Sequence, residues 1–328
     1  MKINAAIIGS GIGIKHLEAI NKYKKSDVKI LCEKNKAKRK ILIKKYPSIK
    51  IVKNENDIFL DKNINLVSIA SYDNDHFGQI VKCIKYNKNI IVEKPMCLKI
   101  SELKIIKSLL RKKPKIKIIS NLVLRVNSLF LNLKKKINIK DIFYIEADYI
   151  WGRIHKLYEW RSKINDYSLT LGAGIHMIDL IMWLLNKRPI SVQTFGNKLV
   201  TKNSKFKKDS FLLFVFKFPN NILAKVTANA AGRYRHFHEV KIFEKGKTFV
   251  HSFRDTYMFD SKNKAKIIKT NYPDKQNRKK LIQNFIDVLI GSRSKEVISL
   301  KEQIDLMTVC FAADKSLKYK KQIKINYL

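Results

Sequence analysis

The first 120 residues alternate between short apolar runs and amphipathic segments, and this alternation limits the possible folds more than any other feature. Apolar runs of strand length stand at residues 3–9, 27–33, 65–71, 89–95 and 115–120. Helical spacing of apolar residues fills the intervals, and Ser101 is the expected N-cap of the last of these helices. Such alternation predicts an α/β domain with a doubly wound parallel sheet, which binds ligands at the carboxyl ends of its strands.

Beyond residue 120 the apolar pattern changes to a period of two. Residues 142–152 alternate, which places Phe143, Ile145, Ala147, Tyr149 and Trp151 on one side of a strand. Further strands are expected at residues 210–219, 222–231, 239–252 and 256–270, the last two as hairpins. Helices follow at 277–291 and 300–319, the second with a capping box of Ser299 and Glu302. We therefore divide the chain into a ligand-binding α/β domain, residues 1–120, and an α+β domain with a large, mostly antiparallel open sheet, residues 121–328.

The chain is strongly basic, with 68 Lys and Arg against 27 Asp and Glu. A net charge of +41 alone would favour a nucleic-acid or membrane partner. The lysines are spread along the whole chain without a recognition motif, so we expect a solvated surface and neither partner. The sequence has no uninterrupted apolar run of membrane-spanning length, no signal-peptide pattern and no C-x-x-C motif, which predicts a cytoplasmic protein without a metal site.

Three glycines, Gly9, Gly11 and Gly13, lie between the first strand and the first helix. The dinucleotide-binding fingerprint is G-x-G-x-x-G, and here the third glycine comes one residue early. Glu33 ends the second strand, where a carboxylate accepts the ribose hydroxyls of NAD. The pattern predicts an NAD site, although a tight strand-to-helix turn without a ligand remains the alternative. Lys34 and Lys36 could balance a 2′-phosphate, which keeps NADP open.

Two further motifs carry candidate catalytic groups. Lys94, in "EKP", stands at the carboxyl end of a predicted parallel strand, although it could be one surface lysine among many. His176 begins a helix whose amino-terminal dipole keeps an imidazole neutral, as a general base requires, and Asp179 shares its face. A purely structural histidine is the alternative.

Together, "GSGIGIKH", Glu33, "EKP" and "GxHxxD" resemble the glucose-fructose oxidoreductase, inositol dehydrogenase and rhizopine catabolism (Gfo/Idh/MocA) family. The similarity extends to "NLVLRVN" at 121–127, "EWR" at 159–161 and "AADKSLK" at 312–318. It implies a Rossmann domain holding NAD(P) and an open-sheet domain that covers the substrate and mediates oligomers, here a dimer or tetramer. It also implies that Lys94 lies near the nicotinamide and that His176 is the acid/base.

The cofactor-binding residues are expected to come from the glycine loop and from neighbouring strand ends. These are Gly9, Ser10, Gly11, Ile12, Gly13, His16, Glu33, Ser71, His76, Glu93 and Lys94.

The chain departs from the family in two places. Its glycine loop is one residue short, and Gly172 stands where many members have an aspartate four residues before the histidine. Proton transfer would then depend on His176 and Lys94 without that carboxylate.

The expected activity is NAD(P)-dependent oxidation of a secondary alcohol on a sugar. Arginines suit phosphate or carboxylate, which favours a nucleotide sugar or sugar acid over a neutral inositol, although arginines could instead pair with acidic residues. Three alternatives remain: an NAD-dependent glycosidase, a non-catalytic NAD-binding protein and a nucleic-acid binder. The expected substrate-binding residues are Asp179, Arg125, Arg161, Arg153 and His238.

Overall fold

The structure, a computed structural model, describes residues 2–269, 272–273 and 276–328. The chain divides into two compact units, unit 1 of Met1–Val126 with Lys275–Ile304, and unit 2 of Asn127–Asp274 with Asp305–Leu328. The sequence-based division at residue 120 differs from this one, because unit 1 also takes a segment from near the carboxyl terminus.

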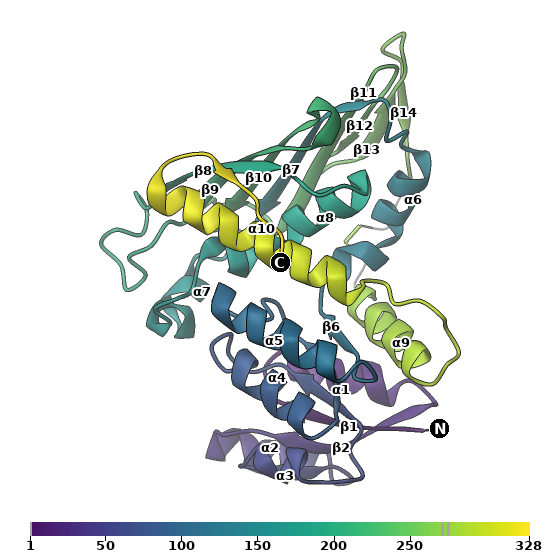
Figure 1. Ribbon diagram of the computed structural model, residues 1–328, viewed down its shortest axis with the longest axis vertical. Coiled ribbons are helices and arrows are strands. Elements are labelled where there is room, and N and C mark those ends of the chain that lie inside the picture. The colour runs from purple at the N-terminus through teal and green to yellow at the C-terminus, as the bar shows by residue number, and fades with distance from the viewer. Residues whose placement is uncertain (1, 270–271, 274–275) are drawn as a thin grey trace. The chain divides into compact units, whose positions relative to one another are not determined.

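Unit 1 is built on a six-stranded sheet in which every strand pairs in parallel with its neighbours. The order is β3-β2-β1-β4-β5-β6, so the strand order reverses between β1 and β4, as expected for a doubly wound sheet. Figure 1 labels β1, β2 and β6 of this sheet. The third strand was not predicted, because it has only three residues and one of them is exposed. The strands are β1 (Ile3–Ile8), β2 (Ser26–Cys32), β3 (Lys50–Val52), β4 (Leu66–Ile69), β5 (Asn89–Val92) and β6 (Ile118–Ser120).

One helix of unit 1 comes from late in the sequence. Helix α9 buries Leu281, Ile282 and Phe285 in the same apolar core as Leu17 and Ile20 of α1, which explains why its segment belongs to this unit. The helices of unit 1 are α1 (Gly13–Asn21), α2 (Lys36–Lys45), α3 (Asn56–Phe59), α4 (His76–Lys85), α5 (Ile100–Lys112), η1 (Val123–Val126) and α9 (Asn277–Leu289).

Two expected helix caps have different outcomes. Helix α5 begins at Ile100, so Ser101 lies inside its first turn and is not the cap; Glu102 instead accepts the backbone N–H groups of Leu98 and Lys99 at 3.0 and 3.2 Å. Before α10 the capping box is confirmed: the backbone N–H of Ser299 donates to Glu302, and that of Glu302 donates to the Ser299 hydroxyl.

Unit 2 is built on a nine-stranded open sheet of order β14-β13-β12-β11-β7-β10-β9-β8-β15. Its strand pairs are antiparallel except for β7 with β10, which confirms the mostly antiparallel sheet. Strands β8 and β15 were not predicted. The strands are β7 (Ile142–Ile150), β8 (Ser191–Asn197), β9 (Phe211–Lys217), β10 (Leu223–Asn229), β11 (Phe237–Glu244), β12 (Thr248–His251), β13 (Thr256–Phe259), β14 (Ala265–Ile267) and β15 (Ile323–Lys324).

The residues predicted to share one side of β7 form its buried face except at the start of the strand. Ile145, Ala147 and Tyr149 are buried, but Phe143 is 56% exposed. The pairing of β7 with β11 shifts register at this end, so that Glu244 lies opposite Ile142. A shift of one residue exchanges the two faces of a strand, which explains why Phe143 points outward.

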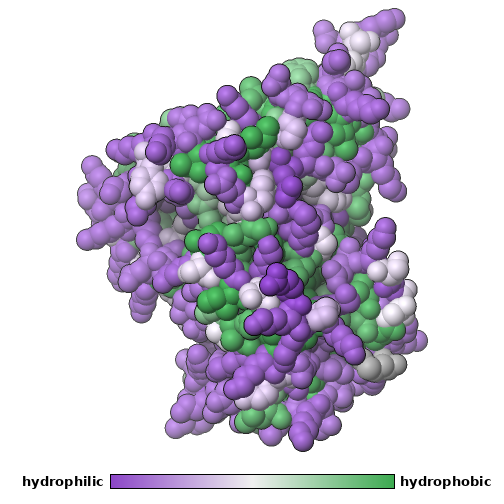
Figure 2. All heavy atoms as spheres, in the orientation of Figure 1, coloured by the Kyte–Doolittle hydropathy of each residue, from purple (hydrophilic) through white to green (hydrophobic). Residues whose placement is uncertain are grey.

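The helices of unit 2 include a π-helical turn directly before α8, the helix that carries His176. Among the described residues, no helix is both long and apolar enough to cross a membrane. Hydrophilic side chains cover most of the face seen in Figure 2. The helices are α6 (Ser128–Lys136), α7 (His155–Tyr158), η2 (Trp160–Lys163), η3 (Thr170–Gly174), α8 (Ile175–Leu185), η4 (Pro219–Asn221) and α10 (Leu300–Tyr319), the last of which begins in unit 1.

Candidate functional site

The glycine loop after β1 requires glycine for a different reason at each position. Gly9 has a φ of +92°, and an added Cβ would lie 2.5 Å from the carbonyl oxygen of Ala70. A Cβ on Gly13 would lie 2.9 Å from Ile7, so this glycine lets α1 pack close against β1. A Cβ on Gly11 would meet no protein atom within 4 Å. The backbone at Gly11 therefore faces open space that a ligand can approach, and the shortened loop keeps all three functions of the fingerprint.

A cavity of about 260 Å³ opens beside this loop, at the carboxyl ends of β1, β2 and β4. Its walls come from the glycine loop, from residues 33–35 and 38 after β2, and from residues 70–72, 75 and 79 after β4. Parallel α/β sheets bind ligands at this place, where the strand order reverses.

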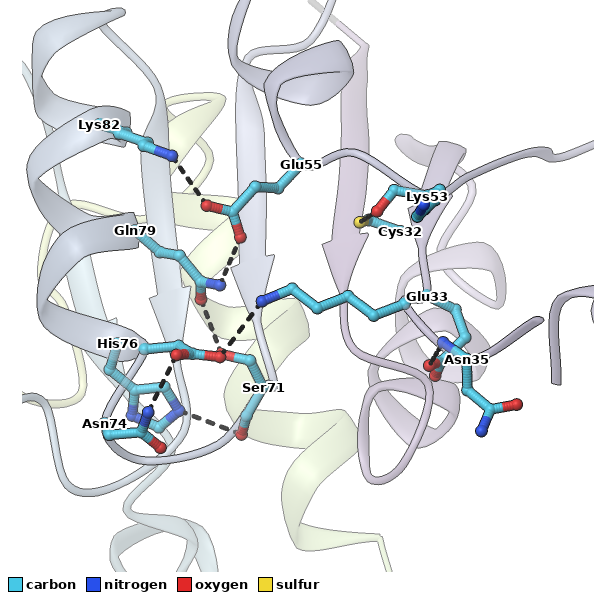
Figure 3. Close-up of polar contacts among 12 residues, drawn as sticks. Cys32, Glu33, Asn35, Lys53, Glu55, Ser71, Asn74, His76, Gln79 and Lys82 are labelled. Atoms are coloured by element: carbon cyan, nitrogen blue, oxygen red, sulfur yellow. Dashed lines mark hydrogen bonds and ion pairs between the residues drawn. The ribbon is translucent and has the colours of Figure 1, made fainter. Parts of the chain in front are cut away.

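Glu33 lies in this cavity as a fixed carboxylate. It accepts a hydrogen bond from the backbone N–H of Asn35 at 2.8 Å (Figure 3). It also accepts hydrogen bonds from the backbone N–H and hydroxyl of Ser10. Partial burial by itself raises the pKa of Glu33, but these hydrogen bonds and the charge of Lys38 lower it below its usual value. The cavity therefore presents a charged acceptor at the place where NAD has its ribose hydroxyls.

A row of side chains fixes the opposite wall of the cavity (Figure 3). The Ser71 hydroxyl donates to Gln79 at 2.7 Å, Gln79 donates to Glu55 at 2.8 Å, and Glu55 accepts from Lys82 at 2.9 Å. Ser71 was expected at this site, whereas Gln79 and Glu55 were missed. The position of Gln79 on α4, three residues after His76, was the available signal.

His16 and His76 were both expected to bind the cofactor, and the structure assigns them a different role. Both are 0% exposed. The two ring nitrogens of His16 lie 2.7 Å from the Ser68 hydroxyl and 3.0 Å from Glu93. His76 Nδ1 lies 2.7 Å from the carbonyl oxygen of Pro95. Enclosed by protein, these rings support the strand ends instead of contacting a ligand.

Glu93, the residue before Lys94, is a carboxylate held in place by several partners. It is hydrogen-bonded to His16 and Asn121, and Arg278 lies 3.7 Å away. Burial alone would raise the pKa of Glu93, but the hydrogen bond to His16 and the positive charges of Arg278 and Lys94 hold it well below its usual range. A permanent carboxylate thus lies next to Lys94 at the end of β5.

In unit 2, His176 belongs to a cluster of rings around Tyr149. Tyr149 and His238 are directly paired across β7 and β11, and their rings stack with centroids 4.6 Å apart. The half-buried His176 ring meets both edge-on, at 5.7 and 6.3 Å. The Tyr149 hydroxyl lies 2.9 Å from His236 Nε2.

Two histidines of the cluster, His236 and His238, have lowered pKa values, and cations lie nearby. Burial, and then the charge of Arg153, lower the pKa of His236 to about 4. Burial also lowers the pKa of His238 well below its usual value, as do the neighbouring histidines. Arg161 stacks on Trp160 at 4.2 Å. The charges of Arg153 and Arg161 both act on Tyr149, where they lower a pKa that burial raises. Of the predicted residues, His176, His238, Arg153 and Arg161 therefore lie in one region of unit 2.

Comparison with protein families decides the identity. The description "Oxidoreductase family, NAD-binding Rossmann fold" matches residues 3–121, and the "GFO/IDH/MocA C-terminal domain" matches residues 135–249. The protein belongs to the Gfo/Idh/MocA oxidoreductase family. Its Rossmann domain is NAD-binding, and the cavity fits this cofactor because the backbone is open at Gly11 and Glu33 is charged.

Solved structures of similar fold include three sugar-related dehydrogenases. Myo-inositol 2-dehydrogenase from Lactobacillus plantarum has a TM-score of 0.85 and 15% identity, covering 99% of this chain and 100% of that one. Scyllo-inositol dehydrogenase from Lactobacillus casei, with NAD(H) and scyllo-inositol bound, has a TM-score of 0.83 and 17% identity over 99% of both chains. UDP-N-acetylglucosamine 3-dehydrogenase from Acidithiobacillus ferrooxidans has a TM-score of 0.82 and 14% identity, covering 97% and 99%.

At Gly172, this Gfo/Idh/MocA protein has no room for a side chain. An added Cβ would overlap the hydroxyl of Tyr167. The Tyr167 ring is buried and held edge-on by Trp160 at 6.4 Å and Phe206 at 5.8 Å. The Tyr167 hydroxyl therefore occupies the space that a side chain at position 172, such as the aspartate of many family members, would need.

Two of the expected substrate contacts are buried side chains. Arg125 lies in η1 of unit 1, is 3% exposed and forms an ion pair with Glu302. For this residue the structure agrees with the alternative interpretation, an arginine paired with an acidic residue. Asp179 is 1% exposed within α8.

Proposed function

We propose that this protein is a dehydrogenase that oxidises a secondary alcohol on a sugar and uses NAD in preference to NADP. One observation carries the proposal: a cavity at the reversal of the sheet, with an open backbone at Gly11 and a charged Glu33 beside it. When bound there, the nicotinamide cofactor would accept the hydride.

We propose Lys94 and His176 as the catalytic residues. As a cation, Lys94 stabilises the developing alkoxide, and its charge acts on the neighbouring Glu93 carboxylate. His176 removes the hydroxyl proton. The π-helical turn η3 continues directly into α8, so His176 does not stand at a free helix start as the sequence predicted. Tyr149 and His238 pack against His176 and limit its ring orientations.

The charges of unit 2 favour an anionic substrate. Arg153, Lys156 and Arg161 lie close enough together for the charges of both arginines to lower the pKa of Lys156, after burial itself. Three clustered cations suit a phosphate or carboxylate better than a neutral polyol. We therefore favour a nucleotide sugar or a sugar acid over an inositol.

The NAD preference follows from the charges around Glu33. Lys34 forms an ion pair with Asp75 at 3.6 Å, which offsets its charge toward a 2′-phosphate. Lys36 is not among the residues that line the cavity. Glu33 then repels a 2′-phosphate, with Lys38 as the cation that moderates this repulsion.

A direct test incubates the protein with NAD⁺ and a panel of nucleotide sugars, uronic acids and inositols, and follows NADH absorbance. We expect turnover with an anionic sugar. NADH binding without turnover on any sugar would instead support the non-catalytic alternative, and tightly retained NAD with glycoside cleavage would support the glycosidase. Absence of both NADH and NADPH binding would contradict the proposal altogether.

A further inference from the structure

Asp75, at the start of α4, is a second carboxylate in the cavity at the glycine loop. It lines the wall that follows β4, whereas Glu33 lies on the wall that follows β2. An aspartate at a helix N-cap normally accepts a hydrogen bond from the backbone N–H of the second or third helical residue. Within the part of the chain that the structure describes, the Asp75 side chain makes no such capping bond to α4. Its carboxylate is therefore available to another partner.

That partner is Lys34, the residue directly after Glu33. Asp75 Oδ2 lies 3.6 Å from Lys34 Nζ, and Asp75 Oδ1 accepts a hydrogen bond from the Asn74 side chain at 3.1 Å. Lys34 and Asp75 both line the cavity, and the segments that carry them form opposite walls. The ion pair therefore draws the Lys34 ammonium toward the wall that follows β4.

Glu55 adds a second negative charge on the same side as Asp75. Burial by itself raises the pKa of Glu55, but hydrogen bonds and the charges of Lys82 and Lys34 lower it below its usual value. Glu55 accepts a hydrogen bond from Gln79 of that wall (Figure 3). The Lys34 ammonium thus interacts with two carboxylates on the side of the cavity away from its own chain segment.

The position of Lys34 matters for cofactor choice, because this lysine directly follows the acid expected at the ribose hydroxyls. A lysine here balances a 2′-phosphate when its ammonium can turn toward it. The main cation acting on Glu33 is Lys38, not Lys34. Arg39 donates to the backbone carbonyl oxygens of Glu33 and Lys34 at 2.9 and 2.7 Å. A 2′-phosphate would therefore meet chiefly Lys38.

We propose that Asp75 is a second determinant of the cofactor preference. By pairing with Lys34 across the cavity, Asp75 withholds that ammonium from a 2′-phosphate and so adds to the repulsion that Glu33 exerts directly. The residue that selects and the residue that assists it thus belong to different walls of the cavity. This inference rests on the proposed function, which gives the preference for NAD, and names a further residue that sets it.

Fluorescence titration of Asp75→Asn with NADH and with NADPH tests the proposal. Asparagine keeps the size of the side chain and is itself a good N-cap, so the fold should not change. We expect NADPH to bind about threefold to fivefold more tightly, the range of an exposed ion pair, and NADH affinity to stay within about twofold. Glu18→Gln, which removes a carboxylate from an ion pair with Lys15 outside the cavity, is the matched control and should change neither affinity.

A double variant shows whether Asp75 acts through Lys34. In a Lys34→Ala background, Asp75→Asn should no longer tighten NADPH binding, because the ammonium that it would release is gone. The same gain in that background would mean that Asp75 only repels the phosphate, and this result would overturn the inference, as would unchanged NADPH affinity in Asp75→Asn alone.

The wild type in the same titrations reports on the proposed function separately. Tighter binding of NADH than of NADPH would leave the proposed preference standing even where the Asp75 variants contradict the inference. Tighter binding of NADPH by the wild type would instead contradict the proposed preference, whichever way Asp75→Asn behaves.

Discussion

The two candidate sites differ in which atoms form them, backbone atoms in one and side chains in the other. At the glycine loop the backbone forms the site, and three glycines within five residues set its shape. Around His176 the side chains form the site, and they come from β7, α8 and β11, more than eighty residues of sequence. A backbone site depends on local conformation, whereas a side-chain site depends on sheet register. The two should therefore respond differently to substitution and to pH.

The largest expected effect separates chemistry from cofactor binding. His176→Ala and Lys94→Ala should each lower kcat by about a thousandfold, the range of a lost acid/base or electrostatic group, and leave NADH affinity unchanged. Steady-state kinetics and NADH fluorescence titration measure the two quantities. His155→Ala, an exposed histidine in α7, serves as the control. A His176→Ala enzyme with full kcat would remove His176 from the mechanism.

Within the glycine loop, neighbouring substitutions should have opposite consequences. Gly9→Ala should destabilise unit 1 by about 3 kcal/mol, because its φ of +92° and the Ala70 carbonyl exclude a Cβ. Gly11→Ala should leave stability within about 0.5 kcal/mol, since its Cβ meets no protein atom, and yet weaken NADH binding. Thermal unfolding and NADH titration of both variants check this contrast. Unchanged NADH affinity in Gly11→Ala would show that no ligand approaches there.

The same contrast explains what the sequence could predict. Both sheets and the glycine loop were predictable because strand periodicity and glycine spacing are local. Arg125 was misjudged because its partner, Glu302, is 177 residues away. His16 is different, since it lies four residues before Ile20 on the inward face of α1, so helical periodicity already indicated its burial. Tyr167 could not be inferred, because only the folded chain brings its hydroxyl to Gly172.

Acid should weaken unit 2 around its histidines before it affects Glu93 in unit 1. The pKa of His251 is about 4 when folded, against about 6.5 unfolded, so the unfolded chain binds the proton first as pH falls. Stability is thus complete above pH 6.5 and decreases toward pH 4, by about 2 kcal/mol between pH 7 and 5. Asp314, with a pKa raised to about 6 by burial, opposes this trend.

Hydrogen exchange of peptides covering β12, at pH 7 and 5, measures this effect. His251→Gln should reduce the loss of protection, because the group that titrates is gone. An identical pH dependence in that variant would refute the assignment to His251. Glu93, whose pKa lies far below this range, should leave peptides of β5 unaffected between the two pH values.

The smallest expected effect concerns Glu33, the side chain that completes the backbone site. Glu33→Gln keeps the shape of the carboxylate but removes its charge, so NADH should bind about tenfold more weakly while NADPH loses less or gains, because Lys38 remains. The ratio of the two affinities is the decisive quantity, since a general disturbance of the loop would weaken both equally. Glu18→Gln on α1, whose carboxylate pairs with Lys15 and lies outside the cavity, controls for net charge. An unchanged NADH/NADPH ratio in Glu33→Gln would mean that the backbone alone selects the cofactor, and that the acid at the end of β2 serves only to hold Ser10 and Asn35.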